Sequence, residues 1–347
     1  MPFNAAPVGE LTSIGIGKES ASAFATPVVP TVFYETETFT PSSKNTLIPR
    51  PGSAKRAGRR PPSTGGYAAT LSFRPGSTPD TIGQLMAYAM GQQSTPVLTG
   101  ASLVAYKSTL SFGTSSALPS FTTEFNRVTD ALDYAGCCVD TMKIALDSDK
   151  GLAVDFGLVA ATEVLQTTPA APTFSNKNIL TMEAPSTNQT INGVAIGASG
   201  QGVAVIKWDV TLNNQLQKNY RGAGAGRKVL AFPLGSRMVG GSLTLGFESN
   251  AQYQQFWGAA GATSPAAAVT GIPILLNVGS QDFADASKSI YFSIALRLAN
   301  CFYESAPVAN KTSGALEQVV TFMSAESAAG GNDDLQIDLY NLTAAVY

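Results

Sequence analysis

The chain has 347 residues, of which 44% are apolar, so it is long enough for two domains of ordinary size with a core in each. Only 13% of the residues are charged, compared with roughly 25% in a typical soluble domain, and the formal net charge is −2. The chain contains no histidine, which excludes Ser-His-Asp and Cys-His catalytic sites, histidine-containing zinc sites and imidazole acid–base chemistry.

Low charge without a membrane-like sequence indicates a surface that is largely covered by partners. The longest uncharged run contains prolines and glycines, so no membrane helix is predicted, and no secretory signal is expected at the N-terminus. Three cysteines make a poor disulfide framework and favour a reducing cytoplasm. We expect no cofactor, no metal and no enzymatic activity.

The first half begins with a segment of small residues and prolines at 1–29, for which we predict an extended arm with little core of its own. A strand is predicted at 31–39. Residues 41–64 contain five prolines, which disfavour helix and most sheet pairing, so a long loop is predicted there. Alternating apolar residues then predict a half-buried strand at 66–73.

A short helix follows this strand. Thr78 is the predicted N-cap, and apolar residues recur at helical spacing from Ile82 to Ala89 before Gly91 ends the helix. Further strands are predicted at 102–112 and 120–128, and then a hairpin. Its strands, at 138–146 and 152–159, turn at Asp147–Gly151. The uncharged, proline-containing segment at 167–172 is the predicted boundary, giving domains at 1–168 and 169–347.

The second half repeats this order. A strand at 202–210 leads into a second loop at 214–239, a strand at 240–247, and a helix with Ser249 as cap and Gly261 as terminator. Later strands are predicted at 289–298, 316–322 and 335–339, and Cys301 falls where Cys137 falls in the first half. The repeated order indicates an internal duplication. The predicted fold is mainly β, with two tandem β-sandwich or partly closed barrel domains, each with one short flanking helix and one long loop.

Both long loops lie in windows that contain no acid, from Phe39 to Arg74 and from Val210 to Phe247. These windows cover under a quarter of the chain but hold twelve of its 22 basic residues. The loop cations are Lys44, Arg50, Lys55, Arg56, Arg59, Arg60, Lys218, Arg221, Arg227, Lys228 and Arg237, and Arg74 completes the set. The rest of the chain has a net charge of about −14, so a nearly neutral total conceals two basic loops and an acidic body.

Three interpretations of the basic loops are open. Nucleic-acid binding predicts cations interleaved with aromatic residues, but the first loop has none between Phe39 and Tyr67. Self-assembly predicts that basic loops on one copy meet the acidic body of the next, in a contact that propagates. A merely solvated loop is the third. For the chain as a whole, the alternative function is a capsid decoration or adhesion module, in which paired β domains are also common. Gly222–Gly226 lacks the spacing of a phosphate loop, and Cys137 and Cys138 are expected to be buried apolar residues.

The order of several motifs resembles the tail tube proteins of long-tailed bacteriophages. These motifs are Ile14–Glu19, the long loops that end in Gly65-Gly66 and Gly240-Gly241, the Leu-x-Phe strand with its helix, and Gly136–Asp140 before the last hairpin. The likeness covers most of the chain and is closest to versions with two tube domains in one polypeptide.

The resemblance implies a structural protein of the virion that assembles in the host cytoplasm. A tandem version is expected to form trimers with pseudo-sixfold symmetry, stacked into a hollow tube through which DNA passes without specific binding. Strands from neighbouring domains would line the lumen, and the loops at 41–64 and 214–239 would reach the adjacent ring. The implied partners are further copies of the chain, a tape measure protein, a tail terminator, and distal tail or baseplate proteins.

Overall fold

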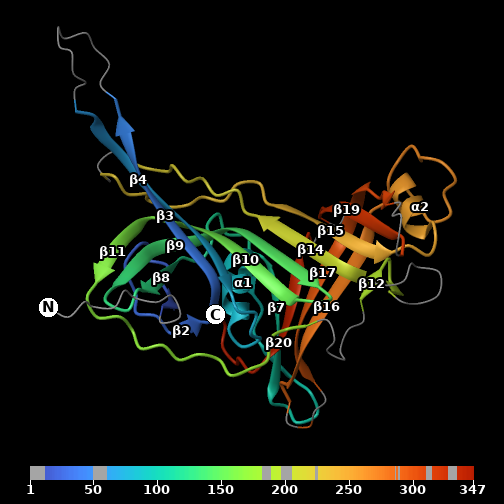
Figure 1. Cartoon of the computed structure of the whole chain (residues 1–347), viewed down its shortest axis with the longest axis horizontal. Helices are drawn as coiled ribbons and strands as arrows, with labels where there is room; N and C mark the ends of the chain where they lie inside the picture. The colour runs from blue at the N-terminus through green and yellow to red at the C-terminus, as the bar shows by residue number, and fades with distance from the viewer. Residues whose placement is uncertain are drawn as a thin grey trace, which may run out of the picture.

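The structure is a computed structural model that describes residues 12–49, 61–181, 189–196, 205–222, 226–285, 287, 290–309, 315–326 and 334–347. Over these residues it is mainly antiparallel β with one short helix in each half, as the sequence predicts (Figure 1). In the described part of the chain, neither helix has the length and apolarity needed to cross a bilayer.

Eight strands form one continuous antiparallel sheet through both halves, and we call this the long sheet. In spatial order its strands are β3 (Thr36–Ile48), β4 (Ser63–Pro75), β10 (Gly151–Ala160), β9 (Ala131–Asp147), β14 (Val205–Asn213), β15 (Met238–Gly246), β19 (Glu317–Ser324) and β17 (Tyr291–Ser305). The halves meet where β9 pairs with β14, with Ile144 opposite Val210. This pairing makes one sheet of two repeats of four strands.

Shorter strands extend both repeats away from the long sheet. The N-terminal part of β9 pairs with β8 (Phe121–Asn126) and β11 (Thr162–Gln166), and β1 (Ser13–Lys18) pairs with β8 and with β2 (Val32–Tyr34). The N-terminal part of β17 pairs with β16 (Ile272–Phe283) and β20 (Gln336–Asn341). The remaining strands are β5 (Gly91–Gln93), β6 (Val97–Thr99), β7 (Ala105–Phe112), β12 (Thr190–Ile191), β13 (Val194–Ala195) and β18 (Val308–Ala309). A second junction joins the halves where β20 pairs with β7.

Helix α1 (Ile82–Met90) is buried along its whole length in a core that runs through both halves. Its N-cap is Thr81, so the prediction of Thr78 was wrong: the Thr78 carbonyl instead accepts the N–H of Ile82 at 3.1 Å, in a turn that precedes the helix. Gly91 ends α1 in a left-handed conformation (φ 88°), as predicted.

Helix α2 (Ala251–Trp257) lies over β17 and is more exposed. It begins after Asn250 and ends at Gly258, so the predicted cap at Ser249 and terminator at Gly261 were also displaced. The helix stops early because the following loop returns to it, and the N–H of Ala266 bonds the carbonyl of Trp257 at 2.7 Å.

The prediction of a coreless N-terminal arm was wrong for the described part of residues 1–29. Strand β1 is central to the first core, with Ile14 and Ile16 almost fully buried. The glycines between them allow the close approach of the next segment. A Cβ on Gly15 would lie 2.6 Å from the Pro30 side chain, and one on Gly17 would lie 2.7 Å from the Val29 carbonyl oxygen.

The first basic loop is shorter than predicted, because β3 continues to Ile48 and β4 begins at Ser63. Pro41 is accommodated within β3, opposite Leu71, because β3 lies at the edge of the long sheet, where a missing N–H costs no ladder hydrogen bond on the outer side. The two strands form a hairpin that extends beyond the rest of the molecule at the upper left of Figure 1.

Candidate assembly surfaces

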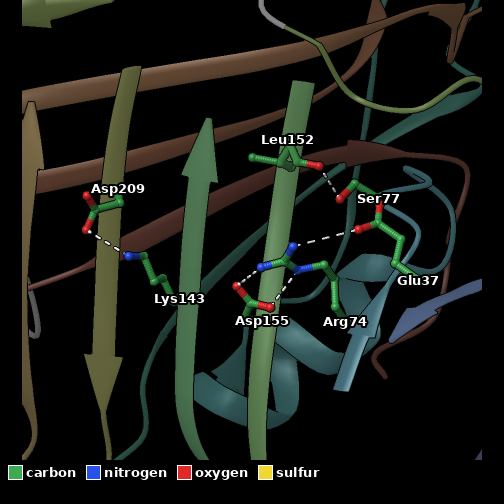
Figure 2. A network of polar contacts seen from close by, with 7 residues as sticks. All are labelled: Glu37, Arg74, Ser77, Lys143, Leu152, Asp155 and Asp209. Carbon is green, nitrogen blue, oxygen red and sulfur yellow. Dashed lines mark hydrogen bonds and ion pairs between the residues drawn. The ribbon is translucent and has the colours of Figure 1, made fainter. Parts of the chain in front are cut away.

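One face of the long sheet carries charged side chains paired across neighbouring strands, and we call it the polar face (Figure 2). Arg74 on β4 donates two hydrogen bonds to Asp155 on β10, both at 2.6 Å, and lies 4.0 Å from Glu37 on β3. Lys143 on β9 lies 3.7 Å from Asp209 on β14. The charges therefore alternate in sign from strand to strand.

These pairs are partly exposed, so each contributes about 1 kcal/mol or less to stability. Their main effect is that these positive charges on the polar face are balanced by neighbouring carboxylates. The hydrogen bonds with Asp155 raise the pKa of Arg74, which remains a cation whose charge is balanced by its neighbour. On the polar face, Arg74 and Lys143 are thus each balanced by a neighbouring carboxylate.

Five of the predicted contact residues, Arg50, Lys55, Arg56, Arg59 and Arg60, lie outside the described residues. Lys44 is exposed on β3, at the edge of the long sheet, and Lys228 is exposed in the second basic loop. The other four, Lys218, Arg221, Arg227 and Arg237, contact the first half of their own chain. Those contacts belong to the connection between β14 and β15, whose described residues are 214–222 and 226–237; we call this connection the docked loop.

Asp140 is the main anchor of the docked loop. Its carboxylate accepts the Leu216 N–H at 3.0 Å and lies 2.6 Å from the Lys218 ammonium, while its carbonyl accepts the Asn214 N–H at 2.8 Å. The buried Asn214 amide donates to the carbonyls of Ala89 and Val139. Asp140 was noted in the sequence only as the end of a motif, and this anchoring role was not predicted.

Two arginines of the docked loop bind β4 near its N-terminal end. Arg221 donates to the Tyr67 carbonyl at 2.7 Å, Arg227 donates to the Gly65 carbonyl at 3.1 Å, and the Tyr67 N–H returns a bond to the Arg227 carbonyl. Arg237 lies over the Phe112 ring at 4.7 Å, and burial lowers its pKa. Four of the five cations of the second loop therefore connect the two halves of one chain.

Apolar contacts complete the docking. Leu216, Val229 and Phe232 of the docked loop form one buried cluster with residues of the first half that include Cys138 and Val159. Figure 1 shows the loop running from β14 and β15 back along the first half toward the β3–β4 hairpin. Burial of this cluster, more than the exposed ion pairs, stabilises the loop in this position.

The two motifs Ile14–Glu19 and Gly136–Asp140 meet at a buried carboxylate. Glu19 is 5% exposed and accepts four hydrogen bonds, from the N–H groups of Ala25 (3.0 Å) and Gly136 (2.7 Å) and the hydroxyls of Ser120 (2.8 Å) and Thr122 (2.9 Å). Gly136 has φ 67°, and a Cβ there would lie 2.9 Å from the Ala161 Cβ. Both motifs are therefore explained by the architecture of the first core.

A second buried carboxylate joins the halves at β20. Asp338 accepts hydrogen bonds from Thr109 of β7 and Arg297 of β17, both at 2.7 Å, and lies 3.2 Å from the Lys107 ammonium of β7. Burial alone would raise the pKa of Asp338, but these three partners together lower it. Ionised Asp338 thus stabilises the contact between the C-terminal strand and the first half.

The cysteines have no chemistry that the structure reveals. All three are buried, and burial raises the thiol pKa of Cys137 and Cys301 to about 12, so both are protonated at neutral pH. In the described ranges, no three Asp, Glu, Cys or His side chains gather in a way that could hold a metal ion. The prominent features of the described surface are sheet edges, charged pairs and a projecting hairpin.

The two repeats of this chain join edge to edge, and the described sheet has an open edge at either end. These features are typical of the subunit of a structural assembly. The comparisons with known proteins agree with this class. A sequence model of the family described as Phage tail tube protein matches residues 9–339, nearly the whole chain, and the chain belongs to this family. No match was found among curated proteins.

Proposed function

We propose that this chain polymerises into stacked rings that form the hollow tube of a phage tail, with three copies per ring in pseudo-sixfold symmetry. The observation that carries this proposal is the pairing of β9 with β14, which joins two four-strand repeats into one sheet within a chain. A pairing that joins the repeats within one chain can also join chains. Three chains of two repeats then supply six equivalent units per ring.

The polar face is proposed to line the lumen. The helices and the apolar core lie on the opposite side of the sheet, so this face is the one available to water inside a tube. Proteins bind DNA mainly through contacts of lysine and arginine with its phosphates, so a cation without an acidic partner would retain it. Because Arg74 and Lys143 are each paired with a carboxylate, DNA would pass over this face without specific binding.

The β3–β4 hairpin is proposed to contact the adjacent ring. It projects from the body, and the segment that connects its strands contains Arg50, Lys55, Arg56, Arg59 and Arg60. A basic projection that meets the acidic remainder of the next ring would set orientation and register. The tube ends would engage a tape measure protein, a tail terminator and distal tail proteins, in a virion assembled in the host cytoplasm.

Negative-stain electron microscopy of the purified protein, over a range of concentration and salt, tests the proposal. Rings and tubes with a central channel are expected. Monodisperse single chains under all conditions would overturn the tube function. Arg59→Glu with Arg60→Glu is expected to leave rings but impair stacking, while the charge-preserving control, Arg59→Lys with Arg60→Lys, should still form tubes. Normal tubes from the Glu variant would remove the role assigned to the hairpin.

A further inference from the structure

The two repeats of the long sheet are equivalent residue by residue, including an irregularity. In β9 the register shifts around Asp140, since Val139 lies opposite Leu158 and Thr141 lies opposite Gly157. In β17 it shifts around Glu304, since Tyr303 lies opposite Phe322 and Ser305 lies opposite Thr321. Because the bulge falls at the same place in both repeats, β9 can be aligned with β17 and the β18 that follows it. In this alignment Thr141 is equivalent to Ser305, and Ile144 is equivalent to Val308.

The strands that precede the two basic segments are equivalent in the same way. Phe39 of β3 lies opposite Phe73 of β4, as Trp208 of β14 lies opposite Leu243 of β15. This makes Lys44 equivalent to Asn213. The inner junction of the chain pairs β9 with β14, and their equivalents are β17–β18 and β3.

Those equivalents lie at the two ends of the long sheet, and both have an outer edge. Among the described residues, β3 pairs with β4 and with no other strand, and β18 pairs only with β19. Val308 is 37% exposed, although its equivalent, Ile144, is fully buried against the partner strand β14. The surface that receives β14 in the first repeat is therefore present in the second, where no described strand covers it.

We propose that residues 305–309 of one copy pair antiparallel with β3 of the next copy, in the register of the β9–β14 junction. In that junction Thr141 lies opposite Asn213 and Ile144 lies opposite Val210. The equivalent register places Lys44 opposite Ser305 and Pro41 opposite Val308, where Pro41 has no N–H to donate, so this junction has one ladder hydrogen bond fewer than the β9–β14 junction. This inference rests on the proposed function, since it specifies the contact between neighbouring copies within a ring.

Side chains beside the junction fit the same register. In the first repeat Leu216 of the docked loop is buried in one cluster with Cys138 and Val159. The residues equivalent to Cys138 and Val159 are Phe302 and Met323, and Met323 is 46% exposed. The residue equivalent to Leu216 is Leu47, which is 57% exposed near the end of β3. Pairing of the two edges would place Leu47 of one copy over Met323 and Phe302 of the next.

The charges agree with this placement. Asp140 at the first bulge forms an ion pair with Lys218 of the docked loop. Glu304 at the second bulge is exposed, and the proposed register places the exposed Lys44 of the next copy beside it. An acid of one copy thus meets a base of the other beside the second bulge, although Lys44 is equivalent to Asn213 and not to Lys218.

Disulfide trapping tests the register. Directly opposite residues of antiparallel strands have Cα atoms roughly 4.5–5.5 Å apart, within the range of a disulfide. The test variant carries Lys44→Cys and Ser305→Cys. The matched control carries Thr141→Cys and Asn213→Cys, which lie opposite each other within one chain. The native cysteines are buried, so the wild type and the two single variants supply the background.

After oxidation of assembled protein, the Lys44–Ser305 variant is expected to migrate on a non-reducing gel as linked dimers and trimers. The control is expected to form its disulfide without any increase in mass. Tubes in the microscope without cross-linked chains, while the control disulfide forms, would overturn the register and leave the tube function standing. Absence of rings and tubes from the wild type would instead overturn the proposed function.

A second variant tests the side-chain contact. Leu47→Asp is expected to reduce ring formation at least tenfold at a fixed concentration, measured by sedimentation velocity, while the melting temperature of the single chain is unchanged because Leu47 is exposed. The control Leu47→Met keeps an apolar side chain and should assemble normally. Unimpaired assembly of the Asp variant would refute the placement of Leu47 on the next copy.

Discussion

Glu19 offers a direct test of how the first repeat is held together. The substitution Glu19→Gln keeps the size of the side chain and removes one of its two acceptor oxygens. Each carboxylate oxygen accepts one backbone N–H and one hydroxyl: Oε1 serves Gly136 and Thr122, and Oε2 serves Ala25 and Ser120. An amide NH2 in place of either oxygen therefore faces a backbone N–H that has lost its acceptor.

The size of the effect follows from this count. A buried N–H left without an acceptor costs about 1–3 kcal/mol. A hydroxyl can rotate to accept from the new amide, so its loss is small. The remaining bonds lose the additional strength of a charged acceptor, which is about 0.5–1.5 kcal/mol. We expect Glu19→Gln to reduce the free energy of unfolding by about 3 kcal/mol.

Thermal unfolding of unassembled protein, followed by circular dichroism, measures this difference as a decrease in melting temperature of roughly 5 °C. Glu35→Gln is the matched control, since Glu35 is exposed, and it should change stability by no more than about 0.5 kcal/mol. If Glu19→Gln melts within 1 °C of the wild type, the four hydrogen bonds do not support the first core as we have argued.

Three further predictions concern the junctions and the polar face. Asp140→Asn should weaken the attachment of the docked loop by about 1 kcal/mol and make tryptic cleavage after Lys218 roughly fivefold faster. Asp338→Asn should make the stability of the fold less sensitive to acid. The pKa of Asp338 is lowered in the folded state, so the stabilisation by its carboxylate is present above roughly pH 4 and is lost as the pH falls through the folded pKa. The melting temperature should therefore fall less between pH 6 and pH 3 in the variant than in the wild type. Asp155→Asn should release Arg74 and increase retention of duplex DNA at low salt, measured by fluorescence anisotropy.

Two of these predictions have a control within the chain. Glu304→Gln alters the equivalent acid of the second repeat and should leave cleavage after Lys218 unchanged in unassembled protein. Asp149→Asn removes an acid in the β9–β10 turn, away from Arg74, and should not increase DNA retention to the same degree. Equal acid sensitivity of Asp338→Asn and the wild type would contradict the role of this carboxylate at the β20 junction.

Most of the correct predictions came from regular patterns of neighbouring residues. The alternation in 152–159 and the turn at Asp147–Gly151 gave the β9–β10 hairpin, because side-chain period and turn residues are properties of neighbouring positions. The duplication was recognised because each repeat keeps its order of elements. Errors came where a distant segment changes the meaning of a local pattern. Residues 13–18 have glycine at alternate positions and look like a coil, but they are a core strand because Pro30 and Val29 pack against those glycines.

The candidate surfaces divide in the same way. The sequence identified the basic windows, but it could not show that four cations of the second window bind their own chain while Lys44 stays exposed. Lys218 and Asp140 are far apart in sequence, and only the folded chain brings them to 2.6 Å. The ion pairs of the polar face depend on the register between β4, β10, β9 and β14, which no spacing along the chain reveals.

By itself, the amino-acid sequence determined that this protein is mainly β, that it contains two related halves, and that twelve of its 22 basic residues lie in two windows without acids, because these are consequences of composition and short-range pattern. The tertiary structure alone decided which edges of the sheet are covered, which carboxylates hold the halves together and which apolar side chains remain exposed. Those outcomes depend on strand register between segments far apart in the chain, and the free energy that selects a register is the burial of side chains contributed by both.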